Sequence, residues 1–194
     1  STDTLGSRST AIGTFALEAQ NFTSATDTYN TAVGYNAGAY ISTGTENTLI
    51  GGLTGDAITT GVRNTALGQD ALTLLTVGAD NTAIGKNALE SDTKGSKSVA
   101  VGINALFAQN FTTATDAYNV AVGTDAGGAV TTGPSNTLIG GLSGDAITTG
   151  GNNVAMGLNS LGSNTGAFSN VAIGVRALED FNVTTATSTY NVAV

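Results

Sequence analysis

Histidine, cysteine and tryptophan are absent from this sequence, which holds a single proline and only six lysines and arginines. Without cysteine there is no disulfide framework and no thiolate metal site. Without histidine or cysteine, a nucleophilic dyad would need serine or threonine beside lysine. Six scattered basic residues, in a chain of net charge −8, provide no patch for phosphates, so we expect no nucleic acid partner. No apolar run reaches the length of a membrane span, so we expect no membrane insertion.

The residues that are present favour a folded chain with a thin core. Glycine is abundant, 40% of the residues are hydrophobic and only 10% are charged. Disordered chains usually combine few apolar residues with dense charge, so this composition argues against disorder. Most of the apolar residues are small, which limits the thickness of any core.

A short motif, Asn-(Thr/Val)-Ala-(Ile/Val)-Gly, recurs along the whole chain. Its glycines follow one another at 17 residues, with two intervals of 21. We take this glycine as position 0 and count other columns from it. The glycine column, which we expect to form structural turns, consists of Gly13, Gly34, Gly51, Gly68, Gly85, Gly102, Gly123, Gly140, Gly157 and Gly174.

A longer repeat lies on top of the short one. Residues 1–61 align with residues 90–150 at an offset of 89. Such block duplication is tolerated by architectures in which each unit contacts only its neighbours. We therefore expect residues 1–194 to form a single repeat domain of about ten rungs. Both ends of the sequence fall inside a repeat, which predicts a fragment of a longer fibre.

The columns around the glycine identify the unit as strand and turn. Position −1 is always a sizeable aliphatic residue, and position −2 is alanine except at Leu49 and Leu138. Position +3 is small, and position +4 is only leucine or glycine. β-Branched residues before a fixed glycine, with Thr/Gly-rich linkers after it, predict an all-β parallel β-solenoid (β-roll) with rungs of 17 or 21 residues. Ten rungs spaced by about 4.8 Å would form a rod roughly 50 Å long.

Position −4 is asparagine in nine of its eleven copies, with Ser9 and Ser98 as the exceptions. Asparagine tolerates left-handed backbone geometry and can bond its side-chain amide to the next rung. We expect a ladder of stacked asparagines at a turn. Its members are Asn30, Asn47, Asn64, Asn81, Asn119, Asn136, Asn153, Asn170 and Asn191.

Both faces of the predicted strands are apolar. Neighbouring strand residues point to opposite faces, so positions −2 and −1 cannot share a side. We expect the alanine columns at −2 and +3 to meet inside the roll, and the −1 and +4 columns to be buried against other copies of the chain. The expected partner is therefore the chain itself, in a homo-oligomer. At Leu49 and Leu138, nearby glycines predict local repacking at conserved volume.

Two stretches carry a family resemblance. Asn64-Thr-Ala-Leu-Gly-Gln-Asp-Ala-Leu72 and Asn81-Thr-Ala-Ile-Gly-Lys-Asn-Ala-Leu89 resemble the 17-residue repeats of bacteriophage and bacterial tail-fibre proteins. Ser98-Val-Ala-Val-Gly-Ile-Asn-Ala105 is similar to the head repeats of trimeric autotransporter adhesins, although those repeats are shorter than 17 residues. The resemblance covers the whole chain. It implies a left-handed homotrimeric fibre with the −1 column facing the three-fold axis.

Catalytic and metal-binding residues are not predicted anywhere in the chain. Ser96-Lys97-Ser98 is interpreted as a turn between rungs, and Gly51-Gly-Leu-Thr-Gly-Asp56 as a tight turn only loosely like a calcium-binding repeat. We therefore expect no enzymatic activity and no cofactor. The aspartates occupy different linker and turn positions with no convergent pair: Asp27, Asp56, Asp70, Asp80, Asp92, Asp116, Asp125 and Asp145.

The 21-residue rungs each carry four extra residues in one linker. Insertions in solenoids map to surface loops, often on a binding face. Each loop opens with an Asn-x-Thr glycosylation acceptor sequence and closes on a tyrosine. One interpretation is a lateral contact with a surface glycan or receptor, or a glycosylated patch; the other is that Phe and Tyr cover the rung edge. The residues concerned are Asn21, Tyr29, Asn110, Tyr118, Asn182 and Tyr190.

Three functions follow from these patterns. The leading one is the structural shaft of an extracellular or virion fibre, which spans distance and supports attachment. The second is a cell-surface trimeric adhesin that binds through its lateral loops. The third is an ice-binding solenoid, but the mixture of threonine and valine at position −3 breaks the regular threonine row that ice binding needs. The expected location is extracellular, on a cell surface or on a virion.

Overall fold

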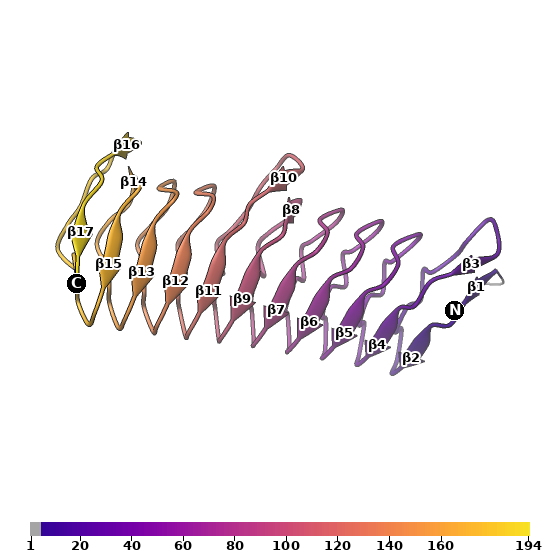
Figure 1. Ribbon diagram of the computed structural model, residues 1–194. Coiled ribbons are helices and arrows are strands. Elements are labelled where there is room, and N and C mark those ends of the chain that lie inside the picture. Colours follow the sequence, from indigo (N-terminus) through magenta and orange to yellow (C-terminus); the bar gives the residue numbers. More distant parts are fainter. Residues whose placement is uncertain (1–4) are drawn as a thin grey trace.

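A computed structural model describes residues 5–194 as a parallel β-solenoid of eleven successive strands, with no helix in this range. The rungs follow one another in a single row from the N-terminus to the C-terminus (Figure 1). The all-β solenoid predicted from the repeat is confirmed. The first four residues of the predicted 1–194 domain lie outside the described range.

Each rung contributes one short strand to one eleven-stranded parallel sheet. Equivalent motif positions pair directly, so Ala32 faces Leu49 and Leu49 faces Ala66. In chain order the strands are β2 (Thr10–Ile12), β4 (Thr31–Val33), β5 (Thr48–Ile50), β6 (Thr65–Leu67), β7 (Thr82–Ile84), β9 (Val99–Val101), β11 (Val120–Val122), β12 (Thr137–Ile139), β13 (Val154–Met156), β15 (Val171–Ile173) and β17 (Val192–Ala193).

Three further pairs of two-residue strands accompany the 21-residue rungs. In each pair the inserted loop adds a strand beside the preceding rung, in parallel register. The loops with β3, β10 and β16 extend along the same edge of the solenoid, beyond the 17-residue turns (Figure 1). The pairs are β1 (Gly6–Ser7) with β3 (Thr26–Asp27), β8 (Gly95–Ser96) with β10 (Thr115–Asp116), and β14 (Ala167–Phe168) with β16 (Thr187–Ser188).

The core is a narrow row of side chains between the sheet and the segment that returns after each glycine. Position −2 points inward from every strand between β4 and β15, and position +3 meets it from the other side. The core also takes in position +7, which the sequence analysis did not single out. Phe181 holds this position in the last complete rung and is partly buried, whereas the aliphatic members are fully buried: Ile41, Ile58, Leu75, Val130 and Ile147.

The prediction that the +4 column would be buried against other copies is wrong. Five of the six +4 leucines lie inside the roll and are at most 2% exposed, and Leu178 near the C-terminal end is partly buried. The reason is that the segment after the glycine is not a strand. Residues +2 and +4 both have positive φ, as at Asn87 and Leu89, so strand alternation does not apply and positions +3 and +4 both face inward. The buried leucines are Leu17, Leu72, Leu89, Leu106 and Leu161.

Leucine replaces alanine at position −2 where the +4 column loses its own side chain. A Cβ on Gly55 would lie 2.9 Å from Cδ2 of Leu49, and a Cβ on Gly38 in the preceding rung would lie 2.9 Å from Cδ1 of the same leucine. Leu138 occupies the corresponding space beside Gly127 and Gly144, at 2.7 Å from each. Each leucine therefore extends into space next to two +4 glycines, which agrees with the local repacking predicted from the sequence.

Candidate functional site: the outer sheet face and the lateral loops

The outward side of the eleven-stranded sheet is an exposed apolar strip. We call the side chains at positions −3 and −1 the outer sheet face. Threonine or valine occupies −3, and isoleucine, valine, leucine or methionine occupies −1. Several −1 side chains leave between 37% and 59% of their surface exposed: Ile12, Ile50, Leu67, Val122, Ile139 and Ile173.

Further apolar side chains continue this strip around the glycine turn. They occupy positions +1 and +2, directly after the glycine, and are 38% to 70% exposed. Phe15 and Tyr35 contact each other edge to face, with ring centroids 6.2 Å apart. These corner residues border the outer sheet face in the rungs that carry them. The corner residues are Phe15, Tyr35, Ile103, Leu142, Leu158 and Val175.

The glycine column lies where adjacent rungs approach most closely. All ten glycines have φ between +122° and +141°. For the nine from Gly13 to Gly157, a Cβ would lie 2.3 to 2.7 Å from the carbonyl oxygen of the next glycine in the column. Any larger residue would therefore force two rungs apart, in addition to adopting an unfavourable backbone conformation.

The asparagine column forms a buried hydrogen-bonded ladder. Asn64 Nδ2 donates to Oδ1 of Asn47 at 3.1 Å and to the carbonyl of Gly78 at 2.9 Å. Asn64 Oδ1 accepts from the backbone N–H of Asn81 at 3.1 Å. The backbone carbonyl belongs to a second column of glycines, three residues before position −4 in six of the rungs. This column was not predicted, although its spacing is regular: Gly44, Gly61, Gly78, Gly95, Gly133 and Gly150.

The left-handed geometry expected at the asparagines occurs instead one residue earlier. Position −5 has φ between +51° and +64° in every copy, and the asparagines themselves do not have positive φ. The asparagine side chain must point inward to bond across rungs, so the exposed residue before it makes the turn. Position −5 varies widely in residue type, from Arg63 to Tyr118, and gave no sequence signal.

A serine and a glutamine replace the missing asparagine at the first two 21-residue rungs. Ser98 keeps the backbone bond to Asn81 Oδ1 at 2.9 Å, but its side chain is too short to continue the ladder. Gln109 supplies the missing acceptor, because its Oε1 accepts from Asn119 Nδ2 at 2.8 Å. Its Nε2 donates to the buried carboxylate of Asp92 at 2.6 Å.

The same substitution occurs at the first 21-residue rung, where Ser9 stands at position −4 and Gln20 accepts from Asn30 Nδ2 at 2.9 Å. The pairing of serine at −4 with glutamine at +7 was therefore visible in the sequence but was not recognised.

The first two lateral loops combine a buried phenylalanine with an exposed tyrosine, and the third has Val183 in place of the phenylalanine. Phe22 and Phe111 are 7% and 6% exposed, so the phenylalanines cover the rung edge. Tyr29 and Tyr118 are 50% and 53% exposed, and Tyr190 is 73% exposed. The phenylalanines therefore cover the rung edge, as one interpretation of the sequence predicted, whereas the tyrosine side chains remain exposed to solvent.

An ion pair ties each of the first two loops to the rung before it. Lys97 Nζ lies 2.6 Å from Asp116 Oδ2 and 5.3 Å from the ring centroid of Tyr118. Arg8 makes the equivalent contacts with Asp27, at 3.0 Å, and with the ring of Tyr29. These pairs are solvent-exposed and contribute little to stability, but they fix the orientation of the tyrosine rings.

The three glycosylation acceptor sites lie at the base of the loops. The side chains of Asn21 and Asn182 are exposed, and that of Asn110 is half-buried. Asn110 Oδ1 accepts a hydrogen bond from Thr93 Oγ1 at 2.9 Å, and Asn182 Oδ1 accepts one from Thr165 Oγ1 at 3.3 Å. Asn21 is therefore the best placed of the three for an attached group.

Residues 5–194 contain no group of three acidic side chains arranged to hold a metal ion. Burial raises the pKa of Asp56 and of Asp145, and the neighbouring carboxylates of Asp70 and Asp125 add smaller effects in the same direction. Residues 5–194 also contain no helix long and apolar enough to cross a bilayer.

Comparisons with protein-family models, with curated proteins and with solved structures found no match. The functional assignment therefore depends on the repeat pattern and on the geometry of the solenoid. In that geometry, the residues predicted from the sequence divide into two groups. The glycine and asparagine columns hold the rungs together, and the loop residues lie along one edge.

Proposed function

We propose that this chain forms the shaft of an extracellular or virion fibre, and that copies of it associate through the outer sheet face. The role is mechanical: the shaft spans distance and supports attachment. Its partner in the shaft is the chain itself, in a homotrimer. The three-fold arrangement and the left-handed winding rest on the resemblance to tail-fibre repeats.

The observation that carries this proposal is the continuity of the exposed apolar face. Soluble monomers rarely expose contiguous apolar surface beyond a few hundred Å². Here a strip of aliphatic side chains extends over all eleven strands of the sheet, roughly 50 Å at the usual strand spacing. The carbonyl and N–H groups of the strands are already paired between rungs, along the solenoid axis. A second copy of the chain can therefore associate with this face only through side-chain packing.

The internal construction of the solenoid also suits a shaft. Every rung repeats the same ladder and the same glycine contact, so length can change by whole rungs without altering the cross-section. The 21-residue rungs show how variation is accommodated, because the inserted loops extend away from the shared core. A chemical role would instead require an irregular site at which several side chains converge.

A cell-surface adhesin that binds through its lateral loops is the second candidate. The observation in its favour is that Tyr29, Tyr118 and Tyr190 are at least half exposed although the phenylalanines of the loops are buried. Binding would then depend on the tyrosines and persist in the assembled fibre. Replacing all three tyrosines with serine should abolish adhesion and leave assembly unchanged if this role is correct.

Light scattering coupled to size exclusion tests the shaft proposal. At micromolar concentration the chain should elute with three chain masses, and negative-stain images should show rods. Ile139→Asp, which places a charge on the outer sheet face, should dissociate the assembly. Thr149→Asp places the same charge on an exposed linker residue and should not. A stable soluble monomer of the unaltered chain would rule out the proposed shaft.

A further inference from the structure

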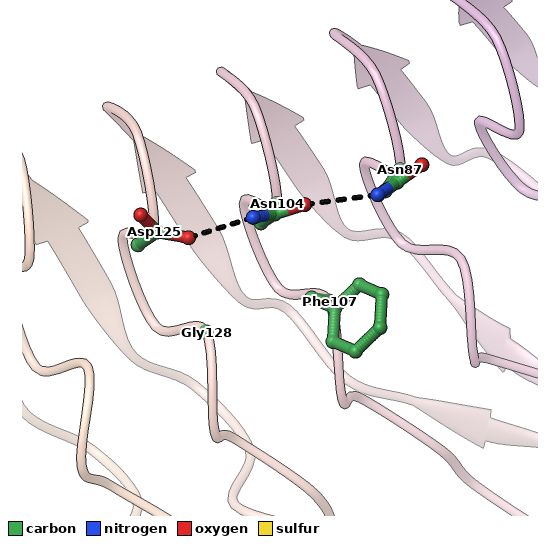
Figure 2. A pocket seen from close by; sticks show the side chains of 5 residues that line it. All are labelled: Asn87, Asn104, Phe107, Asp125 and Gly128. Atoms are coloured by element: carbon green, nitrogen blue, oxygen red, sulfur yellow. Dashed lines mark hydrogen bonds between the residues drawn. The ribbon is translucent and has the colours of Figure 1, made fainter.

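The outer surface of the segment opposite the sheet contains a notch of about 320 Å³. Five residues from three consecutive rungs line it, all at positions +2 or +5: Asn87, Asn104, Phe107, Asp125 and Gly128. Figure 2 shows these residues on the segments that follow the glycines, not on the strands. The outer sheet face, at positions −3 and −1, includes none of them.

A row of polar side chains forms one wall of the notch. Asn87 Nδ2 donates to Asn104 Oδ1 at 3.1 Å, and Asn104 Nδ2 donates to Asp125 Oδ1 at 2.9 Å, as the dashed lines in Figure 2 show. Each amide has two N–H donors and an oxygen with two lone pairs. The row uses one N–H and one lone pair of Asn104, and one carboxylate oxygen of Asp125. Donors and acceptors therefore remain for a bound molecule.

The ring of Phe107 and the backbone of Gly128 form the rest of the notch. Phe107 stands at position +5 and is 37% exposed. One rung further along, position +5 is Gly128, whereas neighbouring rungs have side chains such as Glu90 and Asp145 there. The absent side chain opens the space beside the Phe107 ring. The equivalent place in the first sequence block has Phe15, Glu18, Asn36 and Ala39, so the notch occurs in the second block only.

We propose that this notch binds a neutral saccharide. Sugar hydroxyls both donate and accept hydrogen bonds, which matches the unused valences of Asn104 and Asp125. The C–H face of a sugar ring is apolar and fits against the exposed ring of Phe107. The volume lies at the lower end of small-molecule sites, which suits one or two sugar rings. The carboxylates of Asp125 and nearby Asp145 disfavour acidic sugars.

Gly128 gives a direct way to close the notch without disturbing the fold. Its φ lies outside the left-handed region, and the nearest atom to an added Cβ would be the carbonyl oxygen of Asp125 at 3.3 Å. The chain already accommodates larger residues at this position, since Ala39 and Thr73 occupy it in other rungs. Thr73 donates its hydroxyl to the carbonyl of Leu53 at 3.1 Å, and Gly128→Thr can make the equivalent bond to Asn104.

Saturation-transfer NMR on the full chain tests the proposal with maltose, lactose and N,N′-diacetylchitobiose as neutral probes. Glucuronic acid and 3′-sialyllactose are the acidic probes. At least one neutral disaccharide should receive saturation from the protein, and the acidic probes should receive much less. Gly128→Thr should remove the signal, Phe107→Leu should weaken binding at least tenfold, and Gly162→Thr, the same substitution at a position +5 outside the notch, should leave it unchanged.

Thermal melting by circular dichroism establishes that each variant is folded before its binding is measured. No transfer to any neutral probe overturns the proposal. So does transfer that persists in both Gly128→Thr and Phe107→Leu, because binding would then lie elsewhere. Equal binding of the acidic probes overturns the role given to Asp125. The binding assay is independent of the shaft, since a chain that fails to assemble still contains the whole notch.

Discussion

At the scale of single residues, identical side chains in one column make the same contact in every rung. The asparagine and glycine columns were recognisable from the sequence because each contact requires one residue type. The left-handed residue at position −5 was not recognisable, because it faces solvent and its residue type varies from Arg63 to Tyr118. A column that keeps one residue type can be seen in the sequence, and a column that shares only its backbone conformation cannot.

The glycine column leads to the first prediction. Gly85 has φ of +135°, and a Cβ there would lie 2.3 Å from the carbonyl oxygen of Gly102. Gly85→Val should therefore destabilise the solenoid by at least about 2 kcal/mol, through backbone strain and separation of two rungs. The exposed neighbour Lys86 provides the control, since Lys86→Thr should change the melting temperature little. Similar melting temperatures for the two variants would contradict the role of the glycine.

The second prediction concerns pH and the half-buried carboxylate of Asp56. Burial raises its folded-state pKa, so protonation stabilises the fold; that contribution is complete below the unfolded pKa and is lost as pH rises through the folded pKa. Asparagine resembles the protonated form at every pH. Asp56→Asn should therefore raise the melting temperature at neutral pH, and the gain should shrink on acidification. The exposed Asp180→Asn serves as the control. A gain that does not depend on pH would contradict this account.

At the scale of elements, the strand was easier to predict than the segment that follows it. Three residues before each glycine alternate as a strand does, and the structure has strands there. The segment from +1 to +6 contains two left-handed residues, so inward and outward positions no longer alternate. Leu72 and Leu89 illustrate the consequence, because strand geometry would place them outside and they lie in the core. Sequence periodicity cannot reveal a turn that places neighbouring residues on the same side.

The inserted loops lead to the third prediction. Deleting residues 112–115 restores a 17-residue rung but places Asp116 in the second glycine column, where adjacent rungs nearly touch. The deletion combined with Asp116→Gly should fold and retain the repeat, whereas the deletion alone should melt at a clearly lower temperature. Circular dichroism melting of the two chains distinguishes them. If the two chains have the same melting temperature, the second glycine column tolerates an aspartate and the prediction is wrong.

At the scale of the whole molecule, the solenoid leaves one large surface without a covering layer. The interior is complete within one chain, since the alanine and leucine columns are buried and the asparagine ladder is satisfied there. The −1 side chains of the outer sheet face are all aliphatic or methionine, and many of them remain exposed. The solenoid fold was predicted correctly from the sequence, because it follows from the repeat. The +4 column was wrongly assigned to contacts between chains, because the segment after the glycine was interpreted as a strand.

Cysteine cross-linking tests the association through the outer sheet face most directly, because the chain has no cysteine of its own. Ile84→Cys places one thiol on that face, and Thr60→Cys places one on an exposed linker residue. Under mild oxidation at micromolar concentration, Ile84→Cys should give a disulfide-linked pair of chains on a non-reducing gel, and Thr60→Cys should remain a single chain. If Ile84→Cys remains a single chain, or Thr60→Cys links as readily, the outer sheet face is not where the copies meet.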